Sequence, residues 1–295
     1  MSHKNLVIGT RGSALALRQA HITLEALRKV DPCVSVEVRV ITTYGDIDQN
    51  PIPLDTVGKG WFTKEIENAL INNEIDIAVH SLKDMAEDMP AGLHIGAYLA
   101  REDARDVLIT KHNKSLDELP PNAVIGTDSA RRQIQMLALR PDLRMKSLRG
   151  NIVTRLEKLD PEYDAIILAS AGLKRLGLEQ RITRYFTPTE MTPSPGQGIL
   201  ALQTRDEDPE LRALLLAVQN TDATDAAHIE RAFSRAVGGG CKSPTGAYAF
   251  FDGDECVVVG MLVDETHGIV RAQVRAPRDH SHGLGEILAQ KLQAE

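Results

Sequence analysis

One tetrapeptide, VIGT, occurs twice in this chain, and each copy joins an apolar run to a helical pattern. The copies lie in LVIGTRGSALALRQA, residues 6–20, and in VIGTDSARRQIQML, residues 124–137. In each, the apolar run predicts a strand, the next residues a turn, and the 3.6-residue periodicity a helix. Ser13 is the expected cap of the first helix, and Asp128 or Ser129 that of the second, which spans 130–139 and stops before Pro141. The repeat predicts two α/β domains of similar build.

Arginines gather at these junctions and at two others, SLRGNIVTRL (147–156), where Asn151 is the expected cap, and YDAIILASAGLKRLG (163–177). An arginine in the first turn of a helix opposes the helix dipole by about 0.3–1 kcal/mol, so we expect a bound anion to compensate, helped by free backbone N–H groups. The alternative is that each arginine forms an ordinary surface ion pair. The residues concerned are Arg11, Arg131, Arg132, Arg149, Arg155 and Arg175, with Lys174 beside the last.

The composition argues against several classes of protein. A formal net charge of -7 is unfavourable for a nucleic-acid partner, which usually requires a broad basic face. No apolar run approaches the roughly 18 residues that a membrane span needs, and no signal peptide is recognisable, so we expect a cytoplasmic protein. The three cysteines and nine histidines show no CxxC or HExxH spacing, so no metal site is expected.

The pattern along the chain predicts three domains. Domain 1 comprises 1–99 with 200–218, and includes a half-buried strand at 34–40 and an apolar strand at 75–80. Domain 2 comprises 105–193, reached through a polar crossing at 99–106. Domain 3 comprises 222–295, with a helix, three antiparallel strands and a closing helix from Gly283. The weakly patterned segment 42–62 is long and rich in Gly and Pro, which is typical of a lid.

Two places could carry chemistry. The apolar strand at 75–80 runs directly into Ser81, Lys83 and Asp84, and a carboxylate on such a rigid support could exchange protons with an amine or stabilise a positive charge. The alternative is a solvated helix start. Cys241 lies in GGGCKSPTG, where it could act as a nucleophile or attachment point, or be an unreactive loop cysteine. We expect Cys256 to be buried in the core and Cys33 to be structural.

Six motifs occur together and in one order: VHSLKD, GTDSARRQ, SLRGN, YDAIILASAGLKRLG, GQG and GGGCKSPTG. In these the chain resembles the porphobilinogen deaminase family over nearly its whole length. The resemblance implies an enzyme that joins four porphobilinogen molecules head to tail into hydroxymethylbilane, with loss of ammonia at each addition. It implies a covalent dipyrromethane cofactor, a monomeric protein, and a fold of two periplasmic-binding-protein-like α/β domains flanking a cleft, plus a small α+β domain.

The resemblance also implies roles for individual residues. Asp84 would be the catalytic group, and Cys241 would hold the cofactor through a thioether. Lys59 and Phe62 would belong to the lid. The residues expected to bind the cofactor are Ser81, Lys83, Thr127, Ser129, Arg131, Arg132 and Arg155. Those expected to bind the substrate or growing chain are Arg11, Ser13, Gln19, Arg149, Gly150 and Arg175.

The chain departs from the family pattern at Tyr44, Ala86 and Asp128. Asp128 matters most, because a carboxylate near Arg131 and Arg132 could weaken their hold on the cofactor; alternatively it only caps the helix. Without the resemblance, two other functions stay open. A non-enzymatic receptor for a dicarboxylate or phosphate would use the same arginines but give no role to Cys241 or Asp84. A scaffold that binds a peptide partner has no positive support in the sequence.

Overall fold

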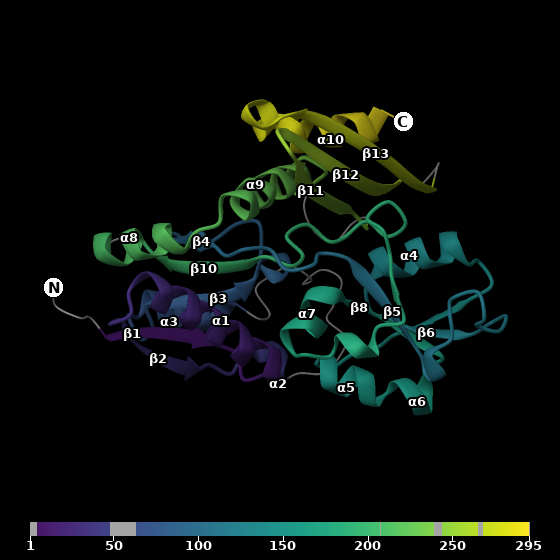
Figure 1. Cartoon of the computed structure of the whole chain (residues 1–295), viewed down its shortest axis with the longest axis horizontal. Helices are drawn as coiled ribbons and strands as arrows, with labels where there is room; N and C mark the ends of the chain where they lie inside the picture. Colours follow the sequence, from purple (N-terminus) through teal and green to yellow (C-terminus); the bar gives the residue numbers. More distant parts are fainter. Residues whose placement is uncertain (1–4, 48–62, 207, 239–243, 265–267, 295) are drawn as a thin grey trace. The chain divides into compact units, whose positions relative to one another are not determined.

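A computed structural model describes residues 5–47, 63–206, 208–238, 244–264 and 268–294. The chain divides into two compact units, residues 1–101 with 199–227 and residues 102–198 with 228–295 (Figure 1). The three-domain division of the sequence stays a prediction. Among the residues described, no helix is long and apolar enough to cross a membrane.

The first unit is built on a five-stranded sheet in the order β2-β1-β3-β10-β4. Strand β1 pairs in parallel with β2 and β3, whereas β10 runs antiparallel between β3 and β4. The strands are β1 (Asn5–Thr10), β2 (Ser35–Val40), β3 (Ile77–Ser81), β4 (Leu93–Tyr98) and β10 (Leu200–Arg205), and the helices are α1 (Ala14–Val30), α2 (Tyr44–Ile47), α3 (Lys64–Ile71) and α8 (Pro209–Val218). Helix α1 buries Ala20 and Leu27 against Ile8 and Leu202, so the apolar stripe predicted from the sequence forms the core of this unit.

The second unit repeats this plan in the order β7-β6-β8-β5-β9. Strand β6, from the second VIGT copy, pairs in parallel with β7 and β8, and β5 runs antiparallel between β8 and β9. The strands are β5 (Asp106–Thr110), β6 (Val124–Gly126), β7 (Arg144–Lys146), β8 (Ala165–Ala169) and β9 (Arg184–Tyr185), and the helices are α4 (Ala130–Leu139), α5 (Ile152–Glu157), α6 (Leu159–Glu162) and α7 (Ser170–Arg175). The mixed α/β class predicted from the repeat is confirmed.

The C-terminal part of the second unit is a three-stranded antiparallel sheet in the order β11-β12-β13. Its elements are β11 (Gly246–Asp252), β12 (Glu255–Asp264), β13 (Gly268–Pro277) and α10 (Leu284–Ala294), together with α9 (Thr221–Ala236) from residue 228 on. Helix α10 packs on β12, where Leu288 and Leu292 lie against Gly260. The predicted small α+β segment is confirmed, and so is the buried position of Cys256.

Helix starts and bounds follow the sequence closely. Ser13, Ser129 and Asn151 each accept a hydrogen bond from a backbone N–H in the first turn of their helix, so the three predicted caps are confirmed. Three expectations need correction. Cys33 is exposed rather than structural. The segment 42–62 includes a short helix, α2, while residues 48–62 lie outside those described. The polar crossing at 99–106 ends in a buried residue, Asp106, because β5 begins there.

The glycine of each VIGT copy is required by close packing rather than by backbone freedom, because neither has a positive φ. A Cβ atom on Gly126 would lie 2.8 Å from Tyr163 Cδ1 and 3.0 Å from both Ile166 Cγ2 and Leu148 Cδ2. A Cβ atom on Gly9 would overlap with Ile75 Cδ1. The repeated glycine therefore lets side chains of the neighbouring elements pack closely against β1 in the first unit and against β6 in the second.

This packing leads to a first prediction. Gly126→Ala should lower the free energy of unfolding by about 1–3 kcal/mol, the usual cost of overpacking a core, although alanine is otherwise the better residue in a strand. Gly283→Ala is the control, since a Cβ there meets nothing within 4 Å. Denaturant unfolding of both variants checks this, and equal losses in the two would contradict it.

Candidate functional site

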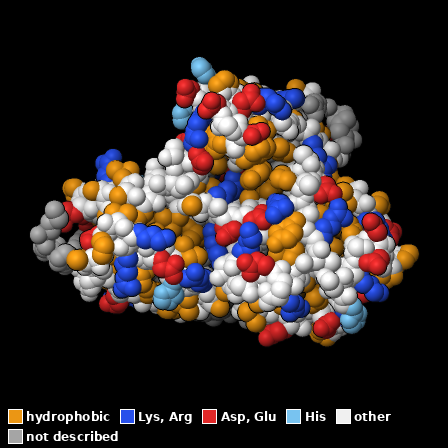
Figure 2. All heavy atoms as spheres, viewed as in Figure 1, with side chains coloured by type: hydrophobic (Ala, Val, Ile, Leu, Met, Phe, Trp, Pro, Cys, Tyr) orange, Lys and Arg blue, Asp and Glu red, His pale blue; other side chains and the backbone are white. Residues whose placement is uncertain are grey.

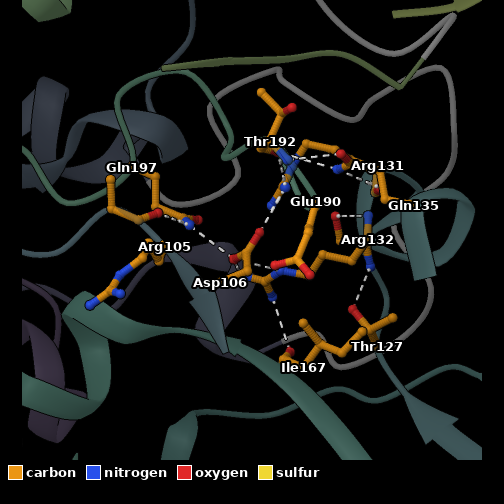
Figure 3. A network of polar contacts seen from close by, with 12 residues as sticks. Arg105, Asp106, Thr127, Arg131, Arg132, Gln135, Ile167, Glu190, Thr192 and Gln197 are labelled. Atoms are coloured by element: carbon orange, nitrogen blue, oxygen red, sulfur yellow. Dashed lines mark hydrogen bonds and ion pairs between the residues drawn. The ribbon is translucent and has the colours of Figure 1, made fainter. Parts of the chain in front are cut away.

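The carboxylate of Asp106 lies between the guanidinium groups of Arg131 and Arg132, all three buried in the second unit (Figure 3). Asp106 Oδ2 is 2.7 Å from Arg131 Nη1, and Asp106 Oδ1 is 2.7 Å from Arg132 Nη2. Arg132 also donates from Nε to Oδ1 at 3.1 Å, so Nε and Nη2 both donate to the same carboxylate oxygen. The contact with Arg131 is a close charge pair without hydrogen-bond alignment.

Backbone and amide groups fix the other edges of this cluster. Arg131 Nη1 donates to Thr192 O at 2.5 Å, and Arg132 Nη1 donates to Ile167 O at 3.2 Å. Gln197 Nε2 donates to Asp106 Oδ1 at 2.9 Å and to Ala104 O at 2.7 Å, as Figure 3 shows for the first of these. The arginine pair is therefore held from β5, from β8 and from the two loop segments around Thr192 and Gln197.

The electrostatics of the cluster favour the charged form of Asp106, whereas burial lowers the pKa of Arg131. Burial alone would raise the pKa of Asp106, but the charges of Arg131 and Arg132 outweigh burial and hold that pKa well below its usual range. Two guanidinium charges thus face one carboxylate charge, which leaves one net positive charge on these three residues. Asp106 therefore supplies an internal counter-charge, as in the ion-pair alternative, and the bound anion expected from the sequence stays a prediction.

Asp128 takes neither of the positions considered from the sequence. Its Oδ2 is 2.6 Å from Nε of Arg149, and its Oδ1 accepts a hydrogen bond from Ser147 Oγ at 2.5 Å. Ser129 caps α4, and Asp106 pairs with the two helix arginines. The parallel pairing of β6 with β7 explains this, because it brings the turns after both strands to one edge of the sheet.

Two further arginines predicted from the sequence, Arg155 and Arg175, donate to backbone carbonyl groups in this unit. Arg155 does not project away but folds back, with Nε donating to Gly150 O at 2.7 Å. Gly150 has φ 117°, a conformation that suits glycine. Arg175 donates from Nη2 to Gly198 O at 2.6 Å, and burial lowers its pKa to about 10, so it stays charged at neutral pH. Thr127 Oγ1 accepts from Ser129 N at 3.3 Å.

In the first unit, the predicted residues lie at the ends of β1 and β3. Gln19 Nε2 donates to Ser81 Oγ at 2.9 Å, which joins α1 to the end of β3. Asp84 is exposed on a 3₁₀ turn, Leu82–Asp84, directly after β3, and Lys83 is half-buried. Arg11 is half-buried in the turn between β1 and the Ser13 cap. The predicted buried strand before these residues is confirmed, and the chemical role of Asp84 stays a prediction.

Two further buried residues, His80 in the first unit and Glu230 in the second, were not predicted. His80 is enclosed in β3 and donates to Gln203 Oε1 at 3.1 Å; burial lowers its pKa to about 4, with the charge of Arg11 adding to the effect. Because the His80 ring is neutral, β3 remains buried up to Ser81 without a charged group in its interior. Glu230 in α9 accepts from Gly196 N at 2.6 Å and from Ala249 N at 2.7 Å. Asp106 and Glu230 had no local signal in the sequence, since each acts on residues 19 to 91 positions away. Gln197 lies in the GQG motif, but the motif does not indicate its partner, Asp106, 91 positions away.

Three predicted residues, Lys59, Phe62 and Cys241, lie outside the described part of the chain. Within that part, no group of three or more His, Cys, Asp or Glu side chains could hold a metal ion. Acidic and basic side chains are interspersed on the face that Figure 2 draws.

Comparisons with known proteins address the whole chain. The family described as porphobilinogen deaminase, dipyromethane cofactor binding domain, matches residues 6–213, and the family described as porphobilinogen deaminase, C-terminal domain, matches residues 224–294. A porphobilinogen deaminase of Alkaliphilus metalliredigens (strain QYMF) is 42% identical over 294 residues, which cover 98% of this chain and 92% of the relative.

Solved structures show weaker likenesses. The methionine-binding protein MetQ has a TM-score of 0.48 at 13% identity, over 76% of this chain and 94% of that one. A nutrient-binding protein from Burkholderia cenocepacia, solved with methionine, has a TM-score of 0.46 at 13% identity, over 74% and 93%. Likenesses this distant leave function to the sequence relatives, and by their identity and coverage the chain belongs to the porphobilinogen deaminase family.

Proposed function

We propose that the net positive charge of the Asp106, Arg131 and Arg132 cluster holds carboxylates of the dipyrromethane cofactor. This charge excess is the observation that carries the proposal. The family's reaction makes hydroxymethylbilane from porphobilinogen, so the chain is a hydroxymethylbilane synthase, a transferase of tetrapyrrole biosynthesis. Every pyrrole unit in this chemistry bears an acetate and a propionate, so cofactor, substrate and growing chain are all polyanions.

The residues fit such a group in charge and in hydrogen-bonding capacity. Arginine presents a planar fork of donors that matches carboxylate geometry. The buried hydroxyl groups of Thr192 and Ser170 have no hydrogen-bond partner among the described residues, so this unit has polar groups that can form further hydrogen bonds. When bound, the cofactor supplies the pyrrole carbon to which the first substrate molecule is joined. Beside Arg131 and Arg132, we assign cofactor binding to Ser81, Lys83, Thr127, Ser129 and Arg155, with Cys241 as the covalent anchor.

For substrate binding we propose a second set of residues, in which two arginines each have a partner at one edge of the guanidinium group. A guanidinium that gives one edge to the protein can offer its other edge to a carboxylate. Arg149 contacts Asp128 through Nε, and Arg175 contacts Gly198 through Nη2. The full set is Arg11, Ser13, Gln19, Arg149, Gly150 and Arg175.

Asp84 is the group that we assign to the chemical step. Its support is the buried strand β3, and the Gln19–Ser81 hydrogen bond fixes the end of that strand. A carboxylate here can take up or return a proton when the aminomethyl group of the substrate leaves as ammonia, and its negative charge stabilises the cation left behind. The exposed position on the turn gives substrate access to the carboxylate.

Some finer features of the protein also belong to this proposal. We assign Lys59 and Phe62 to a lid, and the three-domain division 1–99 with 200–218, 105–193 and 222–295 to the working parts of the enzyme. A monomeric, cytoplasmic enzyme without a metal or nucleic-acid partner is consistent with its substrate, a small dissolved polyanion.

The covalent anchor is tested by intact mass. Wild-type protein from a host that makes porphobilinogen should carry the mass of a dipyrromethane, and Cys241→Ser should carry none, because a hydroxyl is a far weaker nucleophile than a thiolate. Cys33→Ser, at the exposed cysteine, is the matched control and should keep the adduct. An unmodified, folded wild-type protein would refute the assignment of Cys241.

The role of Asp84 is tested by Asp84→Asn. This substitution keeps the shape but removes the negative charge and the proton acceptor, so kcat should fall by about 10²- to 10⁴-fold. Asp88→Asn, an exposed carboxyl four positions along the chain, is the control and should retain activity. Initial rates of ammonia release check both, and a rate within a fewfold of wild type for Asp84→Asn would remove Asp84 from the mechanism.

The buried cluster predicts a pH-dependent stability. Asp106→Asn leaves two buried guanidinium groups without their carboxylate, which should cost roughly 3–5 kcal/mol in the free energy of unfolding at neutral pH. Because the pKa of Asp106 is lowered on folding, this advantage of the wild type is complete above the unfolded-state pKa, near 3.9, and shrinks as the pH falls toward the folded-state value. Denaturant unfolding of both proteins at pH 7, 4 and 3 measures it. A difference that stays constant over this range would contradict the ionised state of Asp106.

A further inference from the structure

Asp128 and Arg149 form a carboxylate–guanidinium pair between two neighbouring turns. The pair lies after β6 on one side and after β7 on the other, with 2.6 Å between Asp128 Oδ2 and Arg149 Nε. About a third of each side chain is exposed, 31% for Asp128 and 34% for Arg149. Water therefore reaches both charges, unlike those of the Asp106 cluster.

This difference in burial decides what each carboxylate can do. A charge pair in the interior cannot exchange partners without leaving a charge unsolvated, which costs several kcal/mol. A half-exposed pair sits in a high effective dielectric and contributes about 0–1 kcal/mol, so another carboxylate can replace one partner with little loss. Asp106 is therefore a fixed counter-charge, and Asp128 is an exchangeable one.

The surroundings of Asp128 make the exchange easier still. Its second oxygen, Oδ1, accepts from Ser147 Oγ, so the carboxylate keeps a hydrogen bond after Arg149 turns to another partner. The backbone of Arg149 is held separately, because Lys158 Nζ donates to Arg149 O at 3.3 Å. The guanidinium can thus change partner while the main chain on both sides stays in place.

We infer that Asp128 occupies Arg149 as an internal stand-in for a substrate carboxylate and thereby lowers the affinity of this chain for porphobilinogen. The inference rests on the proposed function, in which Arg149 binds substrate or the growing chain. Competition of this kind acts on substrate and transition state alike, so Asp128 should raise KM and leave the chemical step nearly untouched. Because the growing chain gains carboxylates with every addition, weaker binding at Arg149 also aids release of that chain.

The central test is the kinetics of Asp128→Asn, which removes the charge and keeps an oxygen for Ser147. KM for porphobilinogen should fall by about two- to fivefold, the factor that corresponds to an exposed ion pair, with a much smaller change in kcat. A KM that is unchanged or higher would overturn the inference, a higher value meaning that Asp128 orients Arg149 for binding. Asp128→Ser, with an unchanged melting temperature as the criterion of folding, provides a second variant.

The matched control is Asp142→Asn. Asp142 pairs with Arg140 at 2.8 Å, is 40% exposed and lies in the same unit, so it loses the same charge without contact with Arg149. Its KM should equal that of the wild type. An equal fall in KM for both variants would trace the effect to net charge and would overturn the inference.

A double-mutant cycle separates this inference from the proposed function. Arg149→Gln should raise KM, and Asp128→Asn should have no further effect in that background, because its partner is gone. If Arg149→Gln leaves KM unchanged, the substrate role of Arg149 fails. If it raises KM while Asp128→Asn changes nothing in the wild-type background, only the stand-in role fails.

A spectroscopic measurement tests the pair without turnover. In holoenzyme labelled with ¹⁵N-arginine, the Arg149 Nε–H signal, assigned by its loss in Arg149→Gln, should be shifted downfield by its charged acceptor in the wild type. The signal should move upfield in Asp128→Asn and stay in place in Asp142→Asn. An Arg149 signal that ignores Asp128→Asn would show that the two side chains do not pair in solution, which overturns the inference.

Discussion

The organisation of the second unit depends on one carboxylate shared by two guanidinium groups. Asp106, at the start of β5, fixes Arg131 and Arg132 on α4 and accepts from Gln197 in the turn before β10. Burying two arginines is costly unless each is paired and hydrogen-bonded, and here one charge and two backbone carbonyl groups meet that requirement. The pairing is incomplete in charge, and this leftover positive charge is what a polyanionic cofactor can use.

A second buried carboxylate extends the same constraint toward the elements that flank residues 239–243, where we propose that the cofactor is attached. Glu230 accepts from the backbone of Gly196, next to Gln197, and from Ala249 in β11. Helix α9 and strand β11 are the elements on either side of residues 239–243, so Glu230 ties the stem of that segment to the turn that contacts Asp106. Hydrogen bonds within one unit thus connect the arginine pair to α9 and β11, the elements that flank residues 239–243. Under the proposed function, this connection would hold an attached oligopyrrole close to the arginines.

Features that depend on residues close together in the chain, such as helix bounds and caps, were predicted from the sequence. Helix α4 begins and ends as its periodicity indicates, and Ser13, Ser129 and Asn151 cap as their positions suggest, because a cap is a contact over three residues. The VIGT repeat also indicated two α/β parts of similar build, and the two five-stranded sheets have the same plan. The antiparallel strands β5 and β10 and the roles of Asp106 and Glu230 could not be predicted, since their partners lie 19 to 125 positions away. Asp128 illustrates the same limit: its partner depends on which turns the parallel sheet brings together.

The two aspartates show how burial sets the function of an ion pair more than its distance does. The Asp106 contacts at 2.7 Å and the Asp128 contact at 2.6 Å are nearly equal in length. Inside the unit, the low dielectric and the lack of water make the pair permanent, so it can position a guanidinium but cannot yield it. At the half-exposed edge, solvent lowers the cost of separation, and the pair becomes a competitor for any anion that Arg149 meets. A chain that must grip a growing polyanion and later release it can use both arrangements, a fixed counter-charge where the cofactor stays and an exchangeable one where the substrate passes.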